Sequence, residues 1–261
     1  MNPSYKFDPK KCKDAAVQWI RDWFSCNGPE CKAIIGISGG KDSSVVAALC
    51  VEALGRERVV GVIMPNITQP DIDDAWELIH HLSISGYVIP ITNAVQDTLN
   101  AMKMVGVTPS NQAMVNLPAR IRMSTLYAVS QSMNGRVANT CNLSENRIGY
   151  FTRYGDGAGD FSPLGMLTCT EVIAIGHELG LPAHLVDKVP SDGLCGKSDE
   201  DNFGFTYEQL DHSIRLTEDV DERVMDRIRA LEHKNAFKLM PEPTYQAHHD
   251  IFCRRIYTWE D

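Results

Sequence analysis

Ile34-Ile35-Gly36-Ile37-Ser38-Gly39-Gly40-Lys41-Asp42-Ser43-Ser44 is the stretch of sequence that decides the fold of this chain. The apolar run over residues 32–37 predicts a buried strand, and residues 43–54 predict a helix. Between them, the adjacent glycines permit a positive φ and a close approach of the backbone to a ligand. A strand, a glycine turn and a helix N-terminus aim backbone N–H groups and the helix dipole at one point. The stretch therefore predicts an anion-binding loop.

This loop differs from a Walker A phosphate loop. A Walker A loop places a glycine six residues before its lysine and a serine or threonine directly after it. Ile35 and Asp42 stand at those two positions. An acidic residue inside a phosphate-binding loop repels the ligand unless a cation lies between them. Asp42 therefore indicates a Mg²⁺ site beside a polyphosphate.

The composition is that of a large globular domain. The chain has 261 residues, of which 43% are hydrophobic, so we expect one domain over residues 1–261. Its net charge of −9 argues against nucleic-acid binding. Because no stretch is apolar enough for a membrane span or a signal peptide, we expect a cytoplasmic protein without a membrane partner. The eight cysteines form no Cys-x-x-Cys pair, which favours reduced thiols over zinc ligands.

Strand and helix patterns alternate after the loop. Apolar runs at residues 59–64 and 87–91 predict two more strands, and the acids that begin at Asp71 open a helix between them. This order predicts an α/β fold with a doubly wound, mostly parallel sheet and helices on both faces. Such sheets bind ligands at the carboxyl ends of their strands. We therefore expect the residues directly after Ile37 and Met64 to lie at the site.

Six further helices and one further strand are predicted along the chain. Helices are expected at residues 8–24, 92–104, 118–133, 168–179, 207–214 and 219–233, and a fourth strand at residues 136–138. Proline is tolerated at a first helical position, so Pro118 is placed at the start of its helix. That helix carries Arg120 and Arg122 near its start. Two arginines on a solvated helix are usually surface charges, so their spacing alone assigns them no function.

Two loops are unusually polar. Asn139–Phe161 follows the fourth predicted strand, so it lies at the same sheet edge as Ser38, and its polar, glycine-rich composition is typical of a binding loop. Pro190–Gly204 is rich in glycines and acids. We interpret it as a lid over the site, with a plain surface loop as the alternative.

These motifs resemble those of a known family. Ser38–Ser43 resembles the pyrophosphate loop (PP-loop) of the ATP pyrophosphatases, and the chain from Ile34 to Lys234 is similar to the ammonia-dependent NAD synthetases. The most specific similarities lie in the PP-loop and in Asn139–Phe161, with others at residues 119–123, 190–192 and 232–234. The resemblance implies an adenine nucleotide alpha hydrolase-like fold, ATP as co-substrate, Mg²⁺ as cofactor and a homodimer.

The resemblance also implies roles for individual residues. Contacts to ATP are implied for Gly36, Ile37, Ser38, Gly39, Gly40, Lys41, Asp42, Ser43, Thr140, Cys169 and Ser191. Contacts to the substrate deamido-NAD are implied for Arg120, Arg122, Arg153, Asp160, His233 and Lys234. Asp42 and Glu145 are the implied metal ligands, and with Asp160 they are the implied catalytic residues.

Three positions depart from the family pattern. Arg153 stands where the family usually has lysine, and Ser191 replaces a threonine. Cys169 occupies the place of a phosphate-binding lysine, and a neutral thiol cannot supply that charge. Lys41, Lys188 and Lys197 are the alternatives for the missing charge.

The implied reaction is the amidation of deamido-NAD. Adenylation of its carboxylate creates a good leaving group, and ammonia then displaces AMP. The protein therefore mainly positions the reactants and neutralises the charge of the departing pyrophosphate. The chain ends at Asp261 without room for a glutaminase domain, so free ammonia is the expected donor. Two alternatives stay open: another PP-loop amidase or thiolase, or a weakly active nucleotide-binding sensor.

Overall fold

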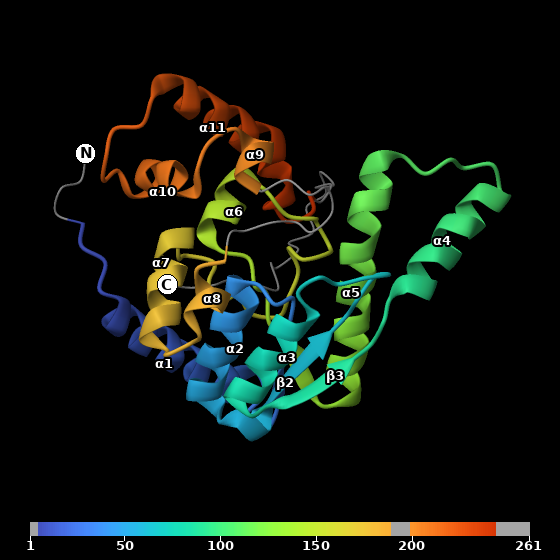
Figure 1. Cartoon of the computed structure of the whole chain (residues 1–261), viewed down its shortest axis with the longest axis horizontal. Coiled ribbons are helices and arrows are strands. Elements are labelled where there is room, and N and C mark those ends of the chain that lie inside the picture. The colour runs from blue at the N-terminus through green and yellow to red at the C-terminus, as the bar shows by residue number, and fades with distance from the viewer. Residues whose placement is uncertain (1–4, 189–198, 244–261) are drawn as a thin grey trace, which may run out of the picture.

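The computed structural model describes residues 5–188 and 199–243, and Figure 1 shows how its elements are arranged. The strands are β1 (Lys32–Gly36), β2 (Val59–Ile63), β3 (Ser85–Val88) and β4 (Gly135–Val137). The helices are α1 (Pro9–Asn27), α2 (Lys41–Leu54), α3 (Ile72–Leu82), α4 (Thr92–Met104), α5 (Asn111–Ser132), α6 (Leu143–Ile148), α7 (Cys169–Glu178), α8 (Ala183–Val186), α9 (Asp199–Phe203), α10 (Tyr207–Arg215) and α11 (Glu222–Asn235). Two 3₁₀ turns, η1 (Arg56–Arg58) and η2 (Ala236–Lys238), complete the described elements.

The four strands form one parallel sheet in the order β3-β2-β1-β4. Ile34 in β1 lies opposite Val60 of β2 on one side and Val137 of β4 on the other. The chain builds outward from β1 to β3 and then returns to place β4 on the opposite side of β1. Such a reversal opens a crevice at the carboxyl ends of the strands. The predicted α/β, doubly wound fold is confirmed.

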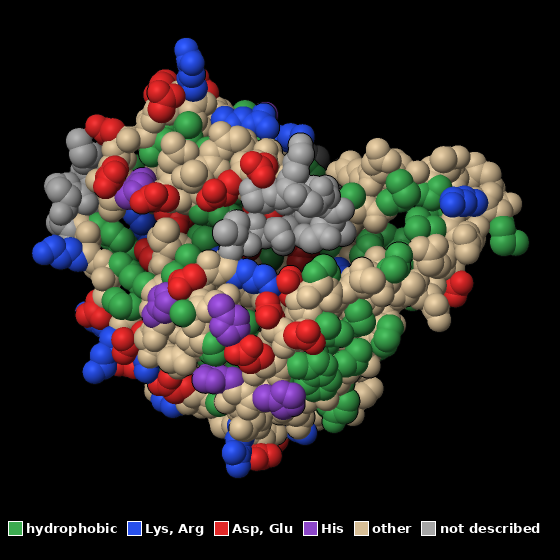
Figure 2. All heavy atoms as spheres, viewed as in Figure 1, with side chains coloured by type: hydrophobic (Ala, Val, Ile, Leu, Met, Phe, Trp, Pro, Cys, Tyr) green, Lys and Arg blue, Asp and Glu red, His purple; other side chains and the backbone are tan. Residues whose placement is uncertain are grey.

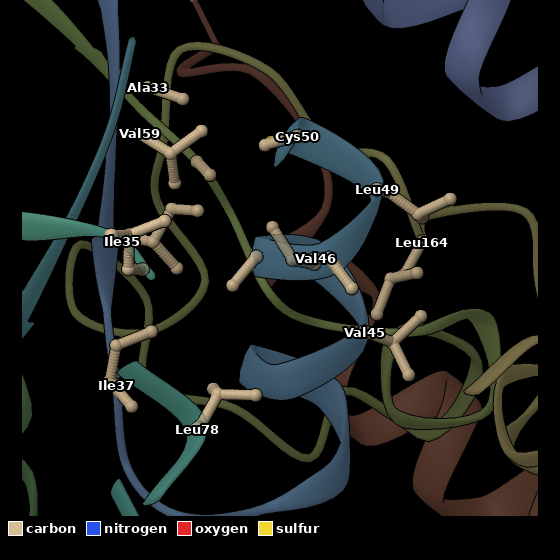
Figure 3. Packing of buried hydrophobic residues seen from close by; sticks show 14 of the residues in the cluster. Ala33, Ile35, Ile37, Val45, Val46, Leu49, Cys50, Val59, Leu78 and Leu164 are labelled. Carbon is tan, nitrogen blue, oxygen red and sulfur yellow. The ribbon is translucent and has the colours of Figure 1, made fainter. Parts of the chain in front are cut away.

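Helices cover both faces of the sheet because the side chains of its strands alternate. Ala33 and Ile35 belong to one buried cluster with Val46 of α2, and Figure 3 shows this packing. Ile34 points to the other face and belongs to a second cluster with Leu126 of α5. A strand whose successive residues are all buried is what a sheet covered on both faces requires.

The helix that carries the two arginines begins earlier than predicted. α5 starts at Asn111, where Ser110 Oγ accepts a hydrogen bond from Ala113 N at 3.2 Å, and it continues through Pro118. The placement of Pro118 at a first helical position was therefore wrong. The Ser110 cap starts the helix about two turns upstream, and Pro118 is buried inside it.

The remaining predicted elements are present with small shifts at their ends. β3 begins before its predicted start and ends before Pro90, which has no N–H group to donate. α2 begins at Lys41, directly after its cap residue Gly40. The other predicted helices correspond to α1, α4, α7, α10 and α11.

Two further parts flank the sheet. The helices α9, α10 and α11 pack on α6 and α7 through a third buried cluster that includes Phe203 and Leu210. On the opposite side, α4 and the start of α5 project from the body as an arm (Figure 1). Across residues 5–188 and 199–243, no helix combines the length and the apolar character that a bilayer crossing requires.

Candidate active site

A cavity of about 660 Å³ opens at the carboxyl end of the sheet. Its walls come from the loop after β1, the segment after β2, α5, the segment after β4 and the residues around η2. Ser38 and Asn66 both line it, so residues that follow Ile37 and Met64 lie on one cavity wall, as expected. Asn66 Oδ1 is a buried acceptor that lacks a hydrogen-bond partner among the described residues. This wall therefore offers an acceptor to a ligand.

The glycine loop is held in shape by its own hydroxyl groups. Ser38 Oγ accepts a hydrogen bond from Gly40 N and lies 3.2 Å from Ser43 Oγ. Gly39 has a φ of +84°, and a Cβ atom there would lie 2.5 Å from the carbonyl oxygen of Asp71, so only glycine fits. The loop leads directly into α2, whose first-turn N–H groups have no partner inside the helix. Loop and helix together have the geometry that the predicted anion-binding site requires.

Asp42 and Glu145 bring two carboxylates to the cavity wall, and Asn142 holds both of them. The Asn142 amide nitrogen Nδ2 donates to Asp42 Oδ1 at 3.0 Å. Its Oδ1 accepts from Glu145 N at 3.0 Å, and Glu145 Oε2 in turn accepts from Asn142 N at 3.1 Å. This capping box starts α6 and fixes the glutamate beside the glycine loop.

Of the two carboxylates, Glu145 has a strongly shifted pKa. Burial and then the charge of Asp42 raise the pKa of Glu145 well above its usual range. A pair of carboxylates that faces an enclosed cavity beside a phosphate-type loop offers the oxygen ligands that Mg²⁺ prefers. The residues present therefore fit the predicted metal.

Lys41 lies beside the acidic pair. Its side chain is 3% exposed, its Nζ donates to Asp42 Oδ2 at 2.8 Å, and it lies 5.5 Å from the centroid of the Tyr207 ring. Burial by itself lowers the pKa of this amine, but the charges of Asp42 and Glu145 outweigh burial and raise it. The ammonium group therefore stays charged inside the protein.

Cys169 is the first residue of α7 and lies outside the cavity lining. It is 2% exposed, and its backbone N–H donates to Ser144 Oγ at 3.0 Å. Burial raises the pKa of its thiol to about 12, although the charge of Lys41 acts in the opposite direction. Cys169 is thus a neutral packing residue, and no contact from it to the cavity is seen.

A cation and a third carboxylate stand elsewhere on the cavity wall. Arg122 donates from Nε to the carbonyl oxygen of Met64 at 3.0 Å. Burial lowers the pKa of Arg122, while the charge of Asp156 raises it. Asp156 accepts a hydrogen bond from Thr152 N at 3.1 Å, and burial raises the pKa of its carboxyl group. Asp156 is therefore a better proton acceptor than an ordinary surface aspartate.

The structure brings most of the sequence-predicted residues together. The predicted residues that line the cavity are Gly36, Ile37, Ser38, Gly40, Lys41, Asp42, Ser43, Arg122, Thr140 and Glu145. The predicted residues outside its lining are Gly39, Arg120, Arg153, Asp160, Cys169, His233 and Lys234. Arg153 lines a second cavity of about 330 Å³. Ser191, Lys197 and most of the predicted lid lie outside the described residues.

Asp160 is engaged by the protein itself. Its Oδ2 accepts a hydrogen bond from Val137 N at 2.7 Å, and its Oδ1 accepts from the Tyr127 hydroxyl at 3.3 Å. The carboxylate therefore secures the end of β4, beside the bridge between Ala138 and Phe161. A contact between Asp160 and the substrate stays a prediction, as do those of Arg120, His233 and Lys234.

Sequence reasoning missed three residues at this site. Asn142 carried a usable signal, because Asn-x-x-Glu is the pattern of a helix capping box. Asp156 lies inside the polar segment that was singled out, but nothing in its spacing separated it from Asp160. Lys238 lines both cavities and follows the helix predicted at residues 219–233, in a part of the chain for which the sequence predicts no element. Its position depends on tertiary packing that no local pattern reveals.

Comparisons with known proteins agree with this geometry. A sequence model of the family described as NAD synthase matches residues 13–242. The NH(3)-dependent NAD(+) synthetase of Carboxydothermus hydrogenoformans is 38% identical over 228 residues, which cover 85% of this chain and 91% of that protein. The structure of NMN synthetase from Francisella tularensis matches with a TM-score of 0.85 at 34% identity, covering 92% of this chain and 99% of that one. NH3-dependent NAD synthetase from Campylobacter jejuni matches with a TM-score of 0.73 at 30% identity, covering 92% of this chain and all of that one (100%).

Proposed function

The chain belongs to the NAD synthase family, and from that premise we propose that it amidates deamido-NAD with free ammonia, consuming ATP and giving NAD, AMP and pyrophosphate. One observation carries the proposal. The glycine loop, the Asp42–Glu145 pair and Arg122 all line a single cavity. In this proposal the loop holds the polyphosphate, the acidic pair holds a cation and Arg122 anchors an anionic substrate, over a chain that we treat as one domain.

The first step forms an adenylate. A carboxylate oxygen of deamido-NAD attacks the α-phosphorus of ATP, and the bond to the bridging oxygen breaks to release pyrophosphate. Mg²⁺, which Asp42 and Glu145 would hold, supplies positive charge to the departing pyrophosphate. The loop after β1 contributes backbone N–H groups for the same purpose, and Arg122 orients the substrate by its charge. None of these roles requires a covalent intermediate with the protein.

The second step forms the amide. The nitrogen of ammonia attacks the activated carbonyl carbon, AMP leaves with the shared oxygen, and the nitrogen loses a proton. Asp156 is placed to accept that proton, because it lines the cavity and burial raises the pKa of its carboxyl group. We assign this task to Asp156 in preference to Asp160, whose two carboxylate oxygens already accept hydrogen bonds from the protein.

The decisive assay supplies purified protein with deamido-NAD, ATP, Mg²⁺ and ammonium chloride and measures NAD, AMP and pyrophosphate. Equal amounts of all three products are expected, with little NAD when glutamine replaces ammonium. AMP release without NAD would indicate another adenylating amidase or thiolase. ATP binding without any turnover would indicate a nucleotide sensor.

One observation favours a second candidate substrate. The structure of this chain matches that of an NMN synthetase with a TM-score of 0.85, and that of an NH3-dependent NAD synthetase with a TM-score of 0.73. In that case the acceptor is the mononucleotide, nicotinic acid mononucleotide, and the product is NMN. The chemistry at the carboxylate is the same, so the site residues do not separate the two. The ratio of kcat/KM for the two acceptors, measured at equal ATP and ammonium, decides between them.

We also propose that two copies of the chain associate. Apolar side chains are exposed on the edge strand β3 and on the arm, and Figure 2 shows them gathered there. The exposed large apolar residues of these two parts, which we propose as one apolar face, are Tyr87, Val88, Met104, Val105, Val107, Met114 and Val115. Exposed apolar surface of this extent is typical of an interface, and a second copy is the partner that the family resemblance implies. A cytoplasmic location is proposed because the described cysteines are free thiols, as in a reducing compartment.

A further inference from the structure

We propose that Asp74, Glu77 and His184 form a metal site on the outer surface of the molecule, and that this site takes a transition-metal ion of the zinc type. The inference goes beyond the proposed function and does not depend on it, because the three residues line neither of the two cavities. They come from two helices, α3 and α8, which the contact between Glu77 and His184 joins. Figure 2 shows histidine and acidic side chains gathered over this part of the surface.

The three side chains already converge on one point. His184 Nε2 lies 3.1 Å from Glu77 Oε2. One ligand atom from each of the three residues lies within 4.8 Å of those of the other two. A tetrahedral zinc ion with bonds of about 2.0–2.2 Å holds its ligand atoms roughly 3.3–3.6 Å apart. Small rotations of partly exposed side chains therefore bring the three atoms to the spacing that the ion requires.

The arrangement follows from the two helices. Asp74 and Glu77 stand three residues apart in α3, so they share one face of that helix. α8 is a single turn, Ala183–Val186, and it presents His184 to the same face. One imidazole and two carboxylates make three protein ligands. A zinc ion bound to three protein ligands keeps a fourth position for water.

The imidazole determines the class of ion. Mg²⁺ and Ca²⁺ prefer oxygen ligands, whereas imidazole suits zinc and its transition-metal neighbours. With its proton on Nδ1, His184 offers the lone pair of Nε2 to the ion. In the part of the chain that the structure describes, this is the one group that brings three histidine, cysteine or acidic ligand atoms so close together. Asp42 and Glu145 offer only oxygens, so the two places should select different ions.

Asp74 is shared with a lysine on the wall of the active-site cavity. Lys188 lines that cavity, and its Nζ lies 2.6 Å from Asp74 Oδ2 and 2.5 Å from Asp71 Oδ1. A metal ion on Asp74 competes with this ammonium group for the same carboxylate, and the two positive charges repel each other. Metal binding therefore weakens one of the two ion pairs that hold Lys188. The outer site is connected to the cavity wall through this one carboxylate.

The test measures zinc binding by calorimetry on untagged, metal-free protein, with excess Mg²⁺ present to occupy the all-oxygen pair. His184→Gln and Glu77→Gln should each weaken zinc binding at least about tenfold, because even the loss of a residue that only orients a metal ligand costs about 10–100-fold in affinity. Lys188→Met should strengthen zinc binding severalfold, because it removes the ammonium group that competes for Asp74.

His177→Gln is the matched control. His177 Nε2 lies 2.8 Å from Asp187 Oδ1, which makes an exposed pair like that of His184 and Glu77, but no third ligand group of the described residues joins it. This variant should bind zinc as the natural chain does. Zinc should raise the melting temperature of the natural chain and of His177→Gln, and it should leave that of His184→Gln unchanged.

Three results would overturn the proposal. One is equal zinc affinity in the natural chain and a folded His184→Gln variant, with folding checked by metal-free melting curves. Another is zinc binding that disappears when the cysteines are blocked with iodoacetamide, which would place the ion on thiols. The third is a natural chain that binds no zinc at micromolar concentrations. Because none of these measurements involves turnover, they test the metal site whatever the amidation assay shows.

Discussion

Asp42 is the residue on which the chemistry of the cavity depends. It lies in the first turn of α2, accepts hydrogen bonds from Asn142 and Lys41, and raises the pKa of Glu145 across the site. Removing its charge should leave the fold intact, because asparagine keeps the size of the side chain and one of the two acceptor oxygens that bind Asn142 and Lys41 separately. The same substitution should take one carboxylate ligand away from the proposed metal ion.

We therefore predict that Asp42→Asn lowers kcat at least about a hundredfold and raises the Mg²⁺ concentration needed for half-maximal rate. Asp73→Asn is the matched control, since Asp73 lies exposed in the first turn of α3. Kinetics and thermal melting of both variants check the prediction. A rate for Asp42→Asn within a few-fold of the control would remove Asp42 from the metal site.

A second residue pair determines stability at a distance from the cavity. Arg215 donates to both oxygens of Glu171, at 2.7 and 2.6 Å, and Glu171 is 4% exposed. Burial acts to raise the pKa of Glu171, but the hydrogen bonds from Arg215 and Tyr5 outweigh it and lower the pKa below 4.5. An acid whose folded pKa is lowered stabilises the protein above its unfolded pKa, and this contribution is lost as the pH falls through the folded value.

Arg215→Met should therefore destabilise the protein by about 3–5 kcal/mol at pH 7, since it leaves a buried carboxylate unpaired. The difference from the natural chain should begin to shrink as the pH falls through the raised pKa of the variant's unpaired Glu171, and it should shrink further below about 4.5, where the natural chain loses the contribution of its own ionised Glu171. Urea unfolding at several pH values measures both effects. A difference that stays constant with pH would show that packing, and not the charge pair, is responsible.

At the scale of elements, the short helix α6 links stability to catalysis. Asn142 caps it and also holds Asp42, so the same side chain serves the helix and the site. Asn142→Ala should cost about 1 kcal/mol of stability through the lost cap. Asn142→Ser keeps a cap acceptor but loses the amide donor to Asp42. We expect near-normal urea unfolding for the serine variant, with a reduced kcat in both. If the serine variant also kept full kcat, the contact to Asp42 would have no catalytic role.

The arm formed by α4 and the start of α5 carries the proposed interface. Met104 and Val105, at 87% and 77% exposure, lie at the end of α4. We predict that the double variant Met104→Glu/Val105→Glu is monomeric by light scattering, because the charges cannot be buried without partners. Met166→Glu is the control, since Met166 is 75% exposed but lies outside the apolar face. A natural chain that is itself monomeric at micromolar concentration would refute the interface.

Across the whole molecule, the sequence was sufficient to predict the sheet and the glycine loop. It was insufficient to predict which residues form the other walls of the cavity. The strands were predictable because a parallel sheet buries both of its faces, which leaves uninterrupted apolar runs such as Val59–Ile63. The glycine loop was predictable because its residues are consecutive. The start of the helix that contains Pro118 was predicted wrongly, because the cap that begins this helix lies eight residues upstream at Ser110. The capping box of Asn142 was readable from the sequence, but its contact to Asp42 and the roles of Asp156 and Lys238 depend on contacts between distant segments, which no local pattern encodes.

The first and last residues that line the cavity lie far apart along the chain, so they are synthesised at different times. Gly36 leaves the ribosome early, whereas Asn235 and Lys238 line the same cavity and emerge some 200 residues later. Chains grow from the N-terminus, and a growing chain folds its N-terminal parts first. A nascent chain that has already formed β1 to β4 thus exposes its glycine loop in an open groove. The described walls of the cavity are complete only when about nine-tenths of the chain has been translated.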